Sequence, residues 1–93
     1  MKRILIRNAN LFSEKLEYYL TLTVSSKFPG VEMYGVGVDS EKEGFYCVNE
    51  VDYEKERIID FINCLADGLI TQENLRDYCE DYTDMLEFRG IIK

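Results

Sequence analysis

Residues 16–24, LEYYLTLTV, decide the fold of this chain, because apolar side chains recur there at every second position. In an extended strand one face would carry Leu16, Tyr18, Leu20, Leu22 and Val24. The intervening side chains, which include Tyr19, Thr21 and Thr23, would share the other face. This period of two predicts a strand with one buried face and excludes a helix over the same residues.

The residues around this stretch predict three further strands. A Phe-Pro-Gly turn signal at residues 28–30 precedes a strand over residues 31–38. The polar turn at residues 39–44 precedes another strand over residues 45–51. The segment over residues 3–7, with its short apolar run, predicts the fourth strand. Because the connections are of hairpin length, the strands are expected to form an antiparallel meander.

The strand over residues 31–38 can bury either of its faces. One candidate set is Tyr34, Val36 and Val38, and the other is Met33, Gly35 and Gly37. The two glycines lack the third glycine, the lysine and the following helix of a nucleotide-binding loop. Glycines inside a strand are typical of a bulge or of close packing, which is the interpretation favoured here.

From residue 52 onward the apolar period becomes 3.6 and predicts two helices. Asp52 is the expected N-cap of a helix over residues 53–67, near whose end Gly68 lies, and Thr71 is the expected cap of a second helix over residues 72–86. The side chains of the second helix expected to be buried are Leu75, Tyr78, Cys79, Tyr82, Met85 and Leu86.

Together these elements predict a single α+β domain over residues 1–93. An antiparallel β-meander of three or four strands, over about residues 3–51, is followed by an αα-hairpin over about residues 53–87 that packs on one face of the sheet. Residues 88–93 would form a short tail that adds a strand or folds back over the core.

Composition argues against several classes of function. The chain has 18 acidic and 11 basic residues, no histidine and a net charge of −7. Direct nucleic-acid binding needs a basic face, and the absence of histidine removes the commonest general base and the usual zinc ligand. No carboxylate spacing singles out an acid and a base. We therefore expect a protein that is not an enzyme and that needs no cofactor and no metal.

Three cysteines and the N-terminal residues bear on the cellular location. Cys47, Cys64 and Cys79 form no Cys-x-x-Cys pair and are predicted to be buried, reduced thiols. The apolar run at residues 4–6 is too short for a signal peptide, and no stretch has membrane-spanning length. A cytoplasmic location away from membranes is expected.

The negative charge is concentrated in the second half of the chain. Residues 1–46 hold six basic and six acidic side chains, whereas residues 47–93 hold five and twelve. Six acids fall on one side of the second predicted helix, opposite its apolar arc: Glu73, Asp77, Glu80, Asp81, Asp84 and Glu87. Like charges at this spacing destabilise a helix slightly. They indicate a binding surface for a basic partner, or a solvated face that keeps the protein soluble.

Tyrosines on the sheet form a second candidate surface. Tyr19 lies opposite the leucine face, and Tyr34 or Tyr46 is expected to join it on the side of the sheet that the helices leave open. Such a patch would suit self-association or partner binding. Ordinary cross-strand aromatic packing is the alternative.

Two short motifs give the chain a resemblance to small uncharacterised proteins of Firmicutes, particularly clostridia. They are Tyr34-Gly35-Val36 in a strand and Leu75-x-Asp77-Tyr78-x-Glu80-Asp81-Tyr82 in the last helix. The likeness covers residues 16–86, and the family looks like a domain of unknown function. The resemblance implies a bacterial, cytoplasmic setting and supplies no catalytic residue.

The hypothesis that follows is a non-enzymatic protein-interaction or regulatory module. It would bind an unidentified protein with a basic surface through the acidic face of the second helix. One alternative is a small structural homodimer that associates through a sheet edge or the tyrosine-bearing face. Another is a phage-type inhibitor that mimics nucleic acid. High salt should weaken acidic-face binding and leave an apolar dimer intact.

Overall fold

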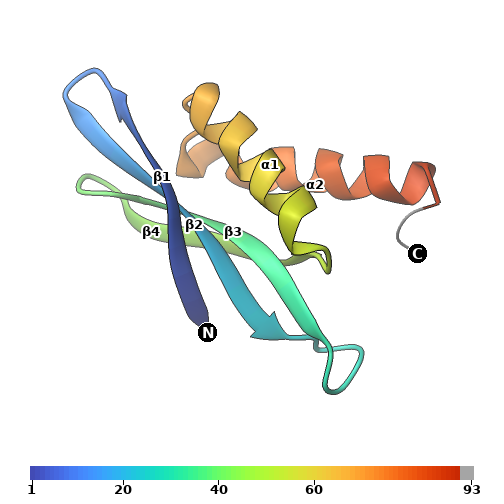
Figure 1. Cartoon of the computed structure of the whole chain (residues 1–93). Helices are drawn as coiled ribbons and strands as arrows, with labels where there is room; N and C mark the ends of the chain where they lie inside the picture. The colour runs from blue at the N-terminus through green and yellow to red at the C-terminus, as the bar shows by residue number, and fades with distance from the viewer. Residues whose placement is uncertain (91–93) are drawn as a thin grey trace.

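The computed structural model describes residues 1–90, which form four strands and two helices (Figure 1). The strands are β1 (Lys2–Leu11), β2 (Glu14–Val24), β3 (Glu32–Ser40) and β4 (Gly44–Asp52), and the helices are α1 (Lys55–Asp67) and α2 (Gln72–Phe88). All neighbouring strands are antiparallel, in the order β1-β2-β3-β4. Both helices lie on one face of the sheet, so the predicted α+β meander with a helical hairpin is confirmed.

The core lies between the sheet and the two helices. Leu16, Tyr18 and Leu20 of β2 are fully buried, as the alternating pattern predicts. The register places Leu20 opposite Val36 and Tyr18 opposite Val38, so these two valines of β3 face the helices as well. The buried face of β3 is therefore the one that carries Val36 and Val38.

Gly35 and Gly37 occupy the open face of β3. Beside Gly35, β4 forms a bulge, because its pairing with β3 passes from Val48 directly to Asp52. A Cβ atom on Gly35 would overlap the Val48 carbonyl oxygen and lie 2.8 Å from Asn49 Cα. Thr21 of β2 donates a 3.0 Å hydrogen bond to Asn49 across this position. The predicted role of the glycines in a bulge and in close packing is confirmed.

The prediction of a tyrosine patch on the open face of the sheet is wrong. Tyr19 does lie there, packed edge-on against Phe45, with the Arg3 guanidinium carbon 4.2 Å from the Phe45 ring centroid. Tyr46, however, is paired with Val38 and therefore faces the helices, where its hydroxyl accepts a hydrogen bond from Arg76. Tyr34 likewise packs against the core. The pairing register of β3 and β4 decides which tyrosines face the helices. That register cannot be read from the composition of the strands.

The N-cap of α1 is Glu54, and the prediction that Asp52 caps this helix is wrong. The Glu54 carboxylate accepts a hydrogen bond from the Glu56 amide, whereas Asp52 is buried and pairs with Arg57. Gly68 ends α1 as predicted. Thr71 lies at the N-cap position of α2, but its side chain makes no capping hydrogen bond.

Several side chains predicted to be buried are exposed. On α2 these are Tyr78 and Met85, which lie at the border of the apolar arc, and on α1 Cys64 is exposed too. Cys79 is buried as predicted, and Cys47 is partly buried. The prediction for the 88–93 tail falls largely outside the described residues. Within residues 1–90, neither helix combines the length and apolarity needed to cross a bilayer.

Candidate protein-interaction groove

The acidic side of α2 faces solvent along its whole length. All six of its acids are exposed: Glu73, Asp77, Glu80, Asp81, Asp84 and Glu87. Within residues 1–90 the ion pairs are Arg7–Asp67, Lys15–Glu17 and Arg57–Asp52, so none of the six is ion-paired there. Arg76, the basic residue of α2, donates its Nε hydrogen bond to the Tyr46 hydroxyl. The charge of this face is therefore not neutralised by a neighbouring base in the described part of the chain.

Two adjoining cavities lie along the acidic helix. The wide one, about 470 Å³, lies between the β2–β3 loop, the end of β4 and the C-terminal half of α2. The narrow one, about 170 Å³, lies between β4 and the middle of α2. Both are lined by Glu50, Val51 and Thr83, so the two cavities adjoin one another. We call this pair of adjoining cavities the β4–α2 groove.

The groove divides the six acids into two sets of three. Glu80 and Asp84 line its narrow end, and Glu87 lines its wide end. Their i, i+4, i+7 spacing keeps them on the side of α2 that faces β4. The remaining three acids, Glu73, Asp77 and Asp81, do not line it. Sequence reasoning found the acidic side of the helix but could not divide it.

Glu50 supplies a fourth carboxylate from the opposite wall. It lies in the β4 bulge with a φ of 55°, and its carboxylate accepts hydrogen bonds from the backbone amide (2.9 Å) and the hydroxyl (2.9 Å) of Ser26. The backbone hydrogen bond from Ser26 is the largest influence that holds the pKa of Glu50 below its ordinary value. Glu50 is thus ionised at neutral pH and also ties the β2–β3 loop to β4. Sequence reasoning missed it, because no local pattern marks the bulge.

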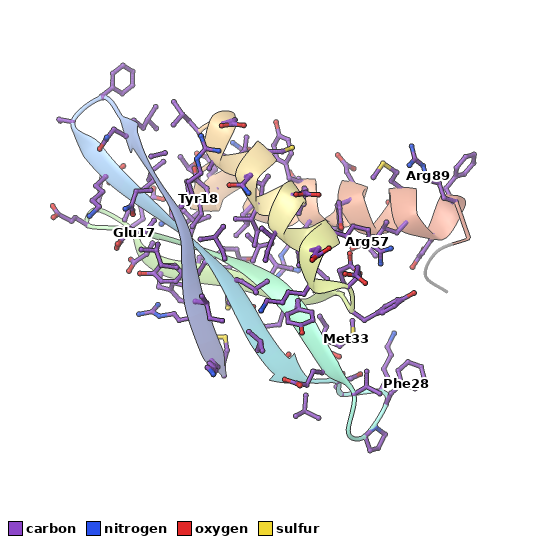
Figure 2. All side chains as sticks on the ribbon, viewed as in Figure 1. Glu17, Tyr18, Phe28, Met33, Arg57 and Arg89 are labelled. Carbon is purple, nitrogen blue, oxygen red and sulfur yellow. The ribbon has the colours of Figure 1, made fainter. Side chains whose placement is uncertain are left out.

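Apolar side chains border the wide end of the groove. Phe28 and Val31 of the β2–β3 loop line it together with Met33 and Val51. Phe28 is 60% exposed and so contributes apolar surface to this end of the groove. In Figure 2 the Phe28 side chain projects from the β2–β3 loop, and Met33 lies farther along β3 toward the helices. The wide end therefore combines apolar and acidic surface.

A buried hydrogen-bond network centres on Asp52, which follows Val51 in β4. Asp52, fully buried at the end of β4, accepts hydrogen bonds from Arg57 Nε (2.8 Å), Arg57 Nη2 (2.6 Å), the Glu54 amide (3.0 Å) and the Tyr82 hydroxyl (2.7 Å). Burial alone would raise the pKa of Asp52, but the hydrogen bonds outweigh it and hold this pKa below its ordinary value. Burial, followed by the hydrogen bond to Asp52, raises the pKa of Tyr82.

The Asp52 network stabilises the fold and is not part of the groove lining. Both Asp52 oxygens are engaged, and Asp52 lines neither cavity of the groove. The Tyr82 ring also stacks on Phe61 of α1, with centroids 4.1 Å apart. The network therefore fixes β4, α1 and α2 relative to one another and holds both walls of the groove in place.

Comparison of the chain with protein-family models, with curated proteins and with solved structures finds no significant match.

Proposed function

We propose that the protein is a non-enzymatic interaction or regulatory module, which binds a basic surface of another protein through the groove-side acids of α2. One observation carries the proposal. Glu80, Asp84 and Glu87 line a groove opposite Glu50, and in residues 1–90 no basic side chain forms an ion pair with any of them.

Electrostatics supports this assignment. Acids at i, i+3 and i+4 on one helix repel one another, and a basic partner would convert this repulsion into attraction. A concave surface on which one sign of charge predominates also concentrates its field and accelerates encounter with an oppositely charged partner. A solvated face that serves solubility alone does not need to line a groove.

Charge reversal of the groove-side acids tests the proposal. The variant Glu80→Lys/Asp84→Lys/Glu87→Lys removes the acids of α2 that line the groove. The matched control Glu73→Lys/Asp77→Lys/Asp81→Lys makes the same change in charge on the same helix outside it. Lysines toward the C-terminus of a helix are favourable and lysines toward its N-terminus are not, so the groove variant should fold at least as well as the control.

The measurement is affinity capture from a lysate of the cells that naturally make the protein, quantified by mass spectrometry. A protein bound by the wild type should be retained by the control variant and depleted about tenfold or more, equivalent to about 1.4 kcal/mol, with the groove variant. Its retention should also fall as the salt concentration rises. Equal depletion by both variants would indicate bulk charge and contradict the proposal, as would equal retention by both. Circular dichroism of both variants checks their folding.

A sheet-edge homodimer is a second candidate, because β1 pairs with β2 alone and leaves its outer edge open within the described residues. Ile4 and Leu5 near the middle of this edge strand are exposed. Sedimentation at low and high salt tests the homodimer. A dimer that persists at high salt and dissociates on the substitution Leu5→Lys would support it, and a monomer under all conditions would exclude it.

A further inference from the structure

The geometry points to a more specific ligand for the β4–α2 groove: a short basic segment of a partner protein that carries one large apolar side chain. The apolar side chain occupies the wide end, and the basic residues that follow it lie along the narrow end. This inference rests on the proposed function, because it assigns the chemistry of the partner at that same site.

The lining of the two ends indicates where the apolar side chain lies. Both ends, about 470 and 170 Å³, have room for one side chain, because a cavity of about 150 Å³ can hold a benzene ring. The exposed Phe28 lines the wide end, whereas Glu80 and Asp84 line the narrow end. We therefore place the apolar side chain at the wide end. There it would cover part of Phe28, Val31 and Met33.

The charges of the lining decide what accompanies this side chain. Four carboxylates line the groove, those of Glu50, Glu80, Asp84 and Glu87, against one basic residue, Lys27. Glu87 borders the wide end, whereas Glu80 and Asp84 lie in the narrow end. Lysine or arginine residues next to the apolar anchor would meet these acids in turn, and an acidic segment would be repelled.

The bulge of β4 decides how the segment binds. A β-bulge disfavours the addition of an extended peptide to the sheet edge at the position of the bulge. Here the pairing of β4 jumps from Val48 to Asp52, and Glu50 has a left-handed backbone conformation. The ligand therefore contacts the groove mainly through its side chains and does not extend the sheet.

Two synthetic peptides test this inference by isothermal titration calorimetry at low salt. The probe is N-acetylated, C-amidated Phe-Lys-Lys-Arg, and its reference has alanine in place of phenylalanine. Wild-type protein should bind the phenylalanine peptide about fivefold or more tightly than the alanine peptide. The groove variant Glu80→Lys/Asp84→Lys/Glu87→Lys should bind neither.

A matched pair of variants locates the apolar anchor. Phe28→Ser removes an exposed side chain from the wide end, whereas Phe12→Ser removes one that is 98% exposed in the β1–β2 turn. Figure 1 shows this turn at the opposite end of the sheet from the β2–β3 loop. The preference for the phenylalanine peptide should vanish in Phe28→Ser and persist in Phe12→Ser. Circular dichroism and urea unfolding confirm that both variants are folded.

The outcomes separate this inference from the proposed function. Equal binding of both peptides by the wild type, lost from the groove variant, would overturn the inference and leave the acidic groove as a binding surface. A preference for phenylalanine that survives Phe28→Ser would also overturn it, because the anchor would then bind elsewhere. No heat with either peptide would count against both the inference and the basic partner.

Discussion

Tyr82 donates a 2.7 Å hydrogen bond to Asp52, thirty positions earlier in the chain, and so joins the middle of α2 to the end of β4. Arg57, in the first turn of α1, holds the same carboxylate through two hydrogen bonds of 2.8 and 2.6 Å. One buried anion thereby connects three elements. Because β4 and α2 form the walls of the β4–α2 groove, this anion also sets the distance between them.

Substitution of Tyr82 by phenylalanine should lower the free energy of unfolding by about 2 kcal/mol, because a hydrogen bond to a buried charged group is lost. The aromatic ring and its stacking on Phe61 would remain. Urea denaturation measures the change. Tyr78→Phe is the matched control, because Tyr78 lies one turn earlier on α2 with an exposed side chain, and its effect should be near zero. Equal effects of the two substitutions would contradict a stabilising role for the hydrogen bond.

Removal of the Asp52 charge should change how stability depends on pH. The pKa of Asp52 is held below its ordinary value of 3.8, so its ionised form stabilises the folded state. This contribution is fully present above the ordinary pKa and is lost as pH falls through the lower, folded-state pKa. Asp52→Asn should therefore cost about 3 kcal/mol at neutral pH, and the difference from the wild type should shrink below about pH 4. Urea unfolding of both proteins at several pH values measures it. A difference that stays constant down to pH 2 would contradict this role.

The layout of the elements could be predicted from the sequence because it follows from local periodicity. The alternation over residues 16–24 predicts the face of β2 that carries Leu16, Tyr18 and Leu20. The 3.6 period predicts the centre of the buried side of α2 but not its border, where Tyr78 and Met85 are exposed. Local patterns fail where two segments distant in sequence meet. Asp52 precedes a helix and therefore has the position of a cap, but Tyr82 and Arg57 engage its carboxylate instead.

The groove likewise could not be predicted from local sequence patterns, because it forms where distant segments meet. The helical period places Glu80, Asp84 and Glu87 on one side of α2, and only the position of α2 beside β4 turns that side into a wall. Glu50 completes the groove because a bulge changes the alternation of β4. That bulge depends on Gly35 of the neighbouring strand, and no sequence pattern within β4 predicts the bulge.

Alanine at Gly35 should destabilise the protein more than alanine at Gly37. A Cβ atom at Gly35 meets backbone atoms of Val48 and Asn49, which cannot move without disrupting the bulge. At Gly37 it would lie 2.6 Å from two ring atoms of Phe45, a side chain that can turn away. The expected losses are about 3 kcal/mol and about 1 kcal/mol, respectively. Urea denaturation of both variants gives the order, and a larger loss for Gly37→Ala would contradict the packing described for the open face.

The three cysteines should differ in their reactivity toward iodoacetamide. Burial raises the pKa of the Cys79 thiol to about 12, so almost no reactive thiolate forms there near pH 8. Cys64 is exposed on α1, and Cys47 is partly buried. Mass spectrometry of the alkylated folded protein should show modification of Cys64 first and of Cys79 last. Cys79 should react rapidly only in denaturant, and its early modification under native conditions would contradict the burial of that face of α2.

Phe12 should be replaceable by glycine with a gain in stability. It lies in the tight turn between β1 and β2 with a φ of 57° and a side chain that is 98% exposed, so it adds backbone strain without packing. Glycine accepts this conformation freely, and Phe12→Gly should raise the free energy of unfolding by about 1 kcal/mol. Phe12→Ala is the control, because it removes the ring but keeps the Cβ atom that causes the strain, and its effect should be small. If alanine stabilised the protein as much as glycine does, the cost of Phe12 would lie in its exposed ring and not in the backbone of the turn.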